Sequence, residues 1–267
     1  MSPPQTPASD IWESLLVAEG APYCWRAGPF ALYFKRVGED WWFAEIPPGD
    51  KGPPEGISHT EPPSESPDWI CWNTPPGVKT IRFDPGLPDR PVLATPETPL
   101  TLAREASARY FVSLPVWVRF VFPEGPKDSL LSHTFPTAAM SDTWAGDFSG
   151  GRLCYNLRMP PARRPEALPT LRCRAICPLT ITNRKPEPLL VDRILIYGEY
   201  LSLWLDSAIQ LWTNPMEVVF SDGQPEPKIH FHSGAYPKLQ NPVLRTAASK
   251  AQKSGLLKWP SRLNPFL

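Results

Sequence analysis

Apolar and polar residues alternate along much of the chain, with β-branched and aromatic residues at the apolar positions, which is typical of half-buried strands. In residues 30–46, two such runs flank Gly38-Glu39-Asp40, and this arrangement predicts a β-hairpin with a short turn. Further strands are predicted at residues 69–73, 78–83, 110–122, 152–159, 171–183, 189–205, 208–213, 216–220 and 228–232. Many strands separated by turn residues predict an all-β fold, organised as an antiparallel β-sandwich.

Proline makes this expectation stronger, since 37 of the 267 residues are proline. This share, about three times the usual one, disfavours long helices because proline removes an amide donor and clashes with the preceding turn. Strand starts, sheet edges and turns accept it. Helix is therefore expected only at residues 10–18 and within residues 238–267, as a short helix in a basic C-terminal tail.

Two changes in composition divide the chain. Between Pro47 and Asp68 lie seven prolines, five acids and one lysine, which leaves little to bury, so a mobile acidic loop is expected there. A turn-rich segment follows at residues 84–91, and the later strands are longer and more aliphatic. We predict a small β domain over 10–86 with an acidic Pro-rich loop at 47–68, a larger β-sandwich over 88–236 and a basic tail over 237–267.

The chain start, Met1-Ser2-Pro3-Pro4-Gln5, lacks the cationic and apolar parts of a secretory signal, and no apolar run approaches the ~20 residues of a membrane-spanning helix. We therefore expect a cytoplasmic protein with no transmembrane segment.

Five cysteines, an odd number, fit free thiols in a reducing compartment. Cys24 and Cys71 each precede a tryptophan and are expected in core strands, and Cys173 and Cys177 are expected as core thiols too far apart along one strand to bond.

Several short apolar signatures occur in a fixed order along the chain. They include Arg90-Pro91-Val92-Leu93, Leu114-Pro115-Val116-Trp117-Val118, Ser141-Asp142-Thr143-Trp144-Ala145-Gly146-Asp147, Gly151-Arg152-Leu153-Cys154-Tyr155 and Cys177-Pro178-Leu179-Thr180-Ile181-Thr182-Asn183. With these signatures, residues 23–232 resemble the uncharacterised prokaryotic family known as domain of unknown function 432. The resemblance implies no activity, because none is attached to that family.

Residues 133–155 contain the strongest candidate for catalysis. Asp142 and Asp147 are two carboxylates near Trp144, and His133 lies upstream. A carboxylate pair beside an aromatic ring suits general acid–base chemistry on a sugar. The alternative is a β-connection in which both aspartates accept backbone hydrogen bonds and the nearby glycines supply positive φ.

A metal site is a weaker hypothesis. His230 and His232 flank one residue of a predicted strand and would share a face about 6–7 Å apart, with Asp222 or His133 as the only named third ligand. Without a third ligand the pair is ordinary. No cofactor is expected, because the turn at Phe148-Ser149-Gly150-Gly151 lacks the lysine and following helix of a phosphate-binding loop.

Charge is distributed unevenly although the chain is neutral overall. Residues 1–110 carry 9 basic and 15 acidic side chains, residues 111–226 carry 11 and 12, and residues 227–267 carry 7 and none. The predicted contact residues are Trp144, Trp259, Arg245, Lys250, Lys253 and Lys258. The tail is either a solvated end without a function or has one of three roles: docking on a protein partner or a second copy, which we favour among the three, folding back on the acidic first domain, or binding an anionic membrane surface.

These observations lead to three hypotheses of function. The first is a noncatalytic binding or scaffold protein, because no nucleophile with a base, no metal set and no nucleotide-binding motif is found. The second is a hydrolase that acts on a glycan or another polar substrate through residues 133–155. The third, nucleic-acid or anionic-surface binding through the basic tail, is disfavoured for nucleic acid by the zero net charge.

Overall fold

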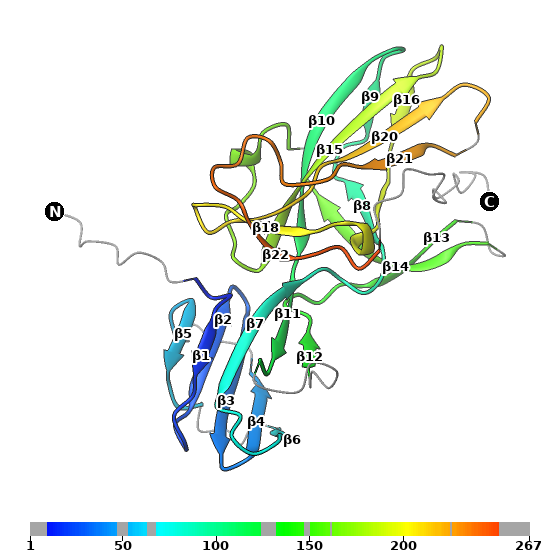
Figure 1. Ribbon diagram of the computed structural model, residues 1–267. Helices are drawn as coiled ribbons and strands as arrows, with labels where there is room; N and C mark the ends of the chain where they lie inside the picture. The colour runs from blue at the N-terminus through cyan, green and yellow to red at the C-terminus, as the bar shows by residue number, and fades with distance from the viewer. Residues whose placement is uncertain are drawn as a thin grey trace. The chain divides into compact units, whose positions relative to one another are not determined.

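The computed structural model describes residues 10–46, 53–62, 68–123, 132–146, 150–160, 162–224 and 226–250. Within these ranges the protein is nearly all β, which confirms the predicted fold class, and its only helical elements are two short 3-10 turns (Figure 1). Asp147, Lys253, Lys258 and Trp259 lie outside the described residues. The chain divides into unit 1, residues 1–86, 116–138 and 171–173, and unit 2, residues 87–115, 139–170 and 174–267.

Unit 1 contains two sheets, in the orders β1-β7-β11-β12 and β5-β2-β3-β4-β6. Their strands are β1 (Ser14–Leu16), β2 (Tyr23–Ala27), β3 (Phe30–Val37), β4 (Asp40–Glu45), β5 (Gly56–His59), β6 (Ile70–Asn73), β7 (Thr80–Gly86), β11 (Trp117–Val121) and β12 (Ser132–Phe135). β3 and β4 form the predicted hairpin, with Gly38 at φ +62° in the turn, a conformation that glycine adopts without strain.

The core of unit 1 is built from aromatic rings. Trp25, Phe34, Phe43, Phe83 and Phe120 are fully buried. Phe43 and Phe120 stack with ring centroids 4.2 Å apart, and Trp25 lies 5.7 Å from Phe83. Because aromatic rings are large, a few of these side chains are enough to fill the interior of a small unit.

Unit 2 contains a seven-stranded sheet with β21-β20-β15-β19-β18-β22 in order and β10 paired to β15, a four-stranded sheet β13-β14-β8-β17, and the pair β16-β9. Its elements are β8 (Val92–Pro96), β9 (Leu100–Leu102), β10 (Ser107–Pro115), β13 (Asp142–Ala145), β14 (Arg152–Met159), η1 (Pro165–Ala167), β15 (Arg174–Arg184), β16 (Leu189–Val191), β17 (Ile194–Ile196), η2 (Gly198–Tyr200), β18 (Leu203–Leu205), β19 (Leu211–Thr213), β20 (Met216–Ser221), β21 (Lys228–Phe231) and β22 (Val243–Thr246).

The core of unit 2 is mostly aliphatic and is shared by residues of both larger sheets. Inward-facing side chains of β8 and β17, such as Ala94 and Ile194, pack in one cluster with those of β15 and β20, such as Leu179 and Val218. This is the packing of a sandwich. Most strand pairs are antiparallel, but β14 runs parallel to β8, and β15 runs parallel to β19 and β20, so both sheets are mixed.

The two units are not consecutive segments, unlike the two domains predicted. The predicted single strand at 110–122 is two strands, because the chain leaves unit 2 after Pro115 and continues in unit 1 as β11. There β11 pairs with β7 on one side and β12 on the other. β11 and β12 therefore belong with the N-terminal strands, since their ladder hydrogen bonds are made there.

Two predictions about the N-terminal half were wrong. Residues 10–18 contain strand β1, not a helix, because Ser14–Leu16 pairs with β7 and a segment this short has little helical stability of its own. Within the loop predicted at 47–68, the described residues include β5, an edge strand that pairs with β2. Arg26 donates to the Pro53 carbonyl and Glu55 accepts from the Gly28 amide at 2.7 Å, so this part of the loop is packed.

The first part of the predicted basic tail also has a fixed place. Residues 243–246 form β22, which pairs with β18, so they are a strand and not a helix. Beyond it the Lys250 amide donates to the Glu199 carbonyl at 2.9 Å, and Lys250 Nζ lies 3.0 Å from Glu199 Oε1. Within unit 2 the chain is therefore fixed as far as Lys250.

The cysteines are free thiols, as predicted. Cys24, Cys173 and Cys177 are buried, whereas Cys71 is exposed on β6, which corrects the prediction of a core position. The cause is that β6 is an edge strand of its sheet, covered by β4 on one side only. No helix in the described ranges is long and apolar enough to cross a membrane.

Candidate functional site

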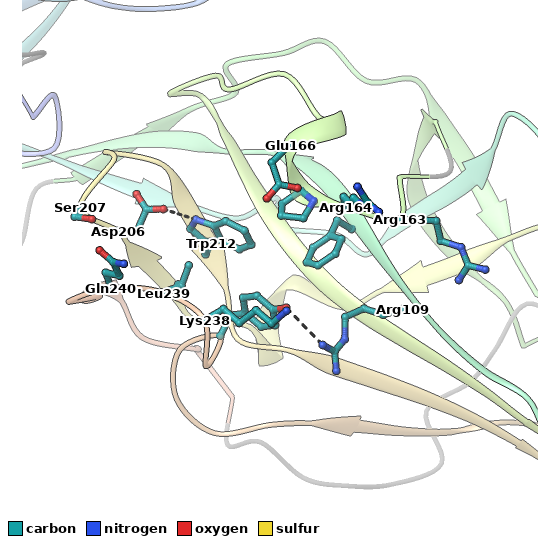
Figure 2. Close-up of a pocket in the computed structure, with 13 residues that line it drawn as sticks. Arg109, Arg163, Arg164, Glu166, Asp206, Ser207, Trp212, Lys238, Leu239 and Gln240 are labelled. Carbon is teal, nitrogen blue, oxygen red and sulfur yellow. Dashed lines mark hydrogen bonds between the residues drawn. The ribbon is translucent and has the colours of Figure 1, made fainter.

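Unit 2 contains a cleft of about 650 Å³ that none of the sequence-predicted sites includes (Figure 2). Five segments contribute to it: β10, the segment around η1, the turn between β18 and β19, β19 itself and residues 236–240. Its lining residues are Arg109, Phe111, Arg163, Arg164, Pro165, Glu166, Asp206, Ser207, Trp212, Tyr236, Lys238, Leu239 and Gln240. The cleft has the size of sites that hold small ligands.

The floor of the cleft is a small aromatic cluster. Trp212 and Tyr236 stack with centroids 5.6 Å apart and planes 11° apart. Phe111 stands edge-on to both, at 6.4 Å from Trp212 and 5.9 Å from Tyr236. All three residues are buried, so they form a packed apolar base under the charged side chains of the cleft.

The segment that contains Arg163 and Arg164 is attached to β10. The Phe111 amide donates to the Ala162 carbonyl at 2.9 Å. Ala162 and Leu168 are buried in the same cluster as the aromatic floor. These two contacts flank Arg163 and Arg164, so both side chains are held on a fixed backbone at the cleft.

The opposite part of the cleft is shaped by the turn at residues 206–210. Asp206 Oδ1 accepts from the amides of Ala208 and Gln210, each at 2.9 Å, and Oδ2 accepts from Trp212 Nε1 at 2.8 Å. Ile209 has φ +60°, a conformation that β-branched residues rarely adopt. The hydrogen bonds of Asp206 hold this strained turn, and strain of this kind concentrates at functional sites.

Four cations and two carboxylates line the cleft, so its net charge is +2. Arg163 lies over the Tyr110 ring at 4.5 Å, and Arg109 lies 5.9 Å from the centroid of Tyr236. In the described part of the chain, no ion pair joins Arg109, Arg163, Arg164 or Lys238 to a carboxylate. Arginine presents planar donors that match carboxylate and phosphate oxygens. Arg109 uses one donor on the Tyr236 hydroxyl at 3.5 Å, and its other donors, with those of Arg163 and Arg164, suit an anion.

The catalytic candidates of residues 133–155 lie elsewhere. Asp142, on β13, forms an ion pair with Arg90 at 3.1 Å, and Arg90 also covers the Tyr155 ring. His133 belongs to unit 1, where its ring contacts Phe135 at 4.7 Å and Trp72 at 5.6 Å. Each side chain therefore has partners within its own unit, and Asp147 lies outside the described residues.

The other predicted residues are also accounted for individually. Trp144 is 47% exposed, as expected for a contact residue. His230 lies on β21 opposite Glu217, and His232 directly follows the end of that strand, where its amide donates to the Pro215 carbonyl at 2.9 Å. The described residues contain no group of three or more metal-binding side chains. Arg245 lies in β22 and Lys250 binds Glu199.

Sequence reasoning missed the cleft because its residues are far apart in the chain. Trp212 lies within the strand predicted at residues 208–213, and its buried ring gives no sign of a site in the sequence. One local signal was present: Arg163 and Arg164 are adjacent cations between prolines at 160, 161 and 165. Proline restricts the backbone, and charged side chains on a restricted loop are candidates for binding.

Comparisons with other proteins give one match. Neither a curated protein nor a solved structure matches the chain. Residues 11–259 match the model of a family described as "Protein of unknown function (DUF432)". The match covers nearly the whole chain and confirms the resemblance seen in the sequence, and the chain therefore belongs to this family.

Proposed function

We propose that the protein is a noncatalytic binding protein and that the cleft of unit 2 holds an anionic ligand. The observation that carries the proposal is that four cations surround one aromatic floor: Arg109, Arg163, Arg164 and Lys238. None of the four forms an ion pair with a carboxylate of the described residues. Like charges gathered in one cleft repel one another, and a bound anion removes that repulsion.

Binding rather than catalysis is favoured by the state of Asp206. Its carboxylate accepts three hydrogen bonds from N–H donors. A carboxylate used in this way holds a turn, because its three donors are the amides of Ala208 and Gln210 and the indole N–H of Trp212. The cleft therefore offers charge and shape to a ligand, while the carboxylate of Asp206 is already engaged in holding the turn.

The proposal is tested by titration calorimetry of the full chain with inorganic phosphate and with citrate. We expect saturable binding of at least one anion, and a Kd that rises with salt because the contacts are ionic. The variant Arg164→Gln should weaken binding about 10-fold, the effect of one lost charge-assisted contact.

Arg158→Gln is the matched control, because Arg158 is an exposed arginine of β14, in the same unit, and does not line the cleft. It should bind like the wild type. If neither anion binds, or if Arg158→Gln and Arg164→Gln weaken binding equally, the cleft is not an anion site.

A further inference from the structure

We infer that the anion is the phosphate group of a phosphorylated sugar, whose hydroxyl groups occupy the end of the cleft opposite the arginines. The inference rests on the proposed function and adds a ligand class to it. It depends on the two ends of the cleft being chemically different, one cationic and one rich in hydrogen-bond acceptors.

The two ends are separated in space. Figure 2 shows Arg109, Arg163 and Arg164 on one side of Trp212, and Asp206, Ser207 and Gln240 on the other. The segments explain this arrangement: the arginines come from β10 and the segment before η1, and the second group comes from the turn after β18 and from residues 236–240. A ligand that spans the cleft therefore meets three guanidinium groups at one end and the carboxylate, hydroxyl and carboxamide groups at the other, with Lys238 of the segment 236–240 also in the lining.

The second end can accept hydrogen bonds from hydroxyl groups. A carboxylate oxygen has about two lone-pair sites, and Asp206 Oδ2 accepts one hydrogen bond, from Trp212, whereas Oδ1 accepts two. Ser207 and Gln240 are exposed and add a hydroxyl and a carboxamide, each of which both donates and accepts. Sugar hydroxyls match this set, since each is also donor and acceptor.

The arginine end favours phosphate. A phosphate dianion offers three terminal oxygens, so it can accept from more than one guanidinium at once. A carboxylate has two oxygens and a single charge. The volume of about 650 Å³ also leaves room beyond one phosphate ion, within the range of sites for small organic ligands.

The test compares ribose 5-phosphate, inorganic phosphate and ribose by calorimetric titration. The inference predicts that ribose 5-phosphate binds at least ~10-fold more tightly than inorganic phosphate, because hydroxyl contacts at the second end add to the phosphate contacts. Ribose alone should bind much more weakly than either. Adenosine 5′-monophosphate, added as a fourth probe, distinguishes a nucleotide from a free sugar phosphate as the source of the group.

Variants at the second end separate the inference from the proposed function. Ser207→Ala and Gln240→Ala should each weaken ribose 5-phosphate about 3-fold to 10-fold and leave inorganic phosphate unchanged. Ser233→Ala, an exposed serine of unit 2 outside the cleft, is the control and should change neither affinity.

The outcomes are distinct. Equal affinity for ribose 5-phosphate and inorganic phosphate, with no effect of the two variants, overturns the sugar-phosphate inference while anion binding stands. Tighter binding of a single-stranded oligonucleotide than of ribose 5-phosphate and adenosine 5′-monophosphate also overturns it, in favour of a nucleic acid. If no anion binds, the proposed function of anion binding in this cleft is wrong as well.

Discussion

Aromatic rings and arginines have different roles in unit 1 and in the cleft of unit 2. In unit 1 the Phe120 ring is enclosed by Phe43 at 4.2 Å and Phe122 at 5.5 Å, and Asp84 binds two arginines, Arg82 at 2.8 Å and Arg119 at 3.4 Å. In unit 2 the rings of Phe111, Trp212 and Tyr236 line an open cleft. The cations around that cleft form no ion pair with a carboxylate of the described residues.

The difference separates arginines that serve the fold from arginines that are available to a ligand. An arginine beside a buried carboxylate such as that of Asp84 satisfies that group and stabilises the native state. An arginine that forms no ion pair in a cleft repels the neighbouring cations, and it lacks the stabilising contact that an ion pair gives. We therefore expect substitutions in unit 1 to change stability, and substitutions of the cleft cations to change binding.

The largest effect is expected for Phe120→Ala in the closed cluster. Phe120 is fully buried, so its truncation should lower the free energy of unfolding by about 3–5 kcal/mol, from lost transfer energy and the cavity that remains. Guanidinium unfolding followed by tryptophan fluorescence measures it. A loss below about 1 kcal/mol would show that the cluster is less well packed than its ring distances indicate.

Cysteine labelling tells which unit is affected. Burial raises the pKa of Cys24 in unit 1 to about 11 and that of Cys177 in unit 2 to about 12, so at pH 8 both are protonated thiols when folded and react only after unfolding. Phe120→Ala should increase the alkylation rate of Cys24 more than that of Cys177. The reverse order would contradict the assignment of Phe120 to the stability of unit 1.

A smaller effect is expected for Asp84→Asn. The substitution keeps the shape but removes the charge that Arg82 and Arg119 bind. Because these arginines are 42% and 44% exposed, water can solvate them again, and the expected loss is about 1–2 kcal/mol by chemical denaturation. Phosphate affinity, measured by calorimetry, should stay unchanged, and a change in it would break the division between the units.

The smallest effect on stability is expected for Arg164→Gln. Its side chain lines the cleft and forms no ion pair in the described part of the chain, so the free energy of unfolding should change by less than about 0.5 kcal/mol. This is the same variant that should weaken anion binding. A loss of stability comparable to that of Asp84→Asn would mean that Arg164 serves the fold.

The sequence predicted the fold class well because alternation is a local signal. The hairpin at residues 30–45 and the exposure of Trp144 could both be derived from a few neighbouring residues. The return of residues 116–138 to unit 1 could not, because it depends on β11 pairing with β7, which is distant in the chain. The same is true of β5, whose polar sequence was taken for a loop although its backbone pairs with β2.

The candidate site was beyond prediction for a related reason. Arg109, Arg163, Trp212 and Lys238 come from four separate segments, and only the pairing of β10, β15 and β19 and the attachment of residue 162 to β10 bring them together. The residues chosen from the sequence were conspicuous by type, such as Asp142 and His133. In the structure these side chains have partners within their own units.

The most direct test of the account is the position of a bound phosphate mimic in a crystal of the full chain. Crystals soaked in sodium tungstate should show a strong anomalous peak in the cleft, within hydrogen-bonding distance of the guanidinium of Arg164 or Arg109, and the peak should be lost in the double variant Arg109→Gln/Arg164→Gln. An empty cleft beside occupied tungstate sites elsewhere on the molecule would contradict the claim that these cations form an anion-binding site.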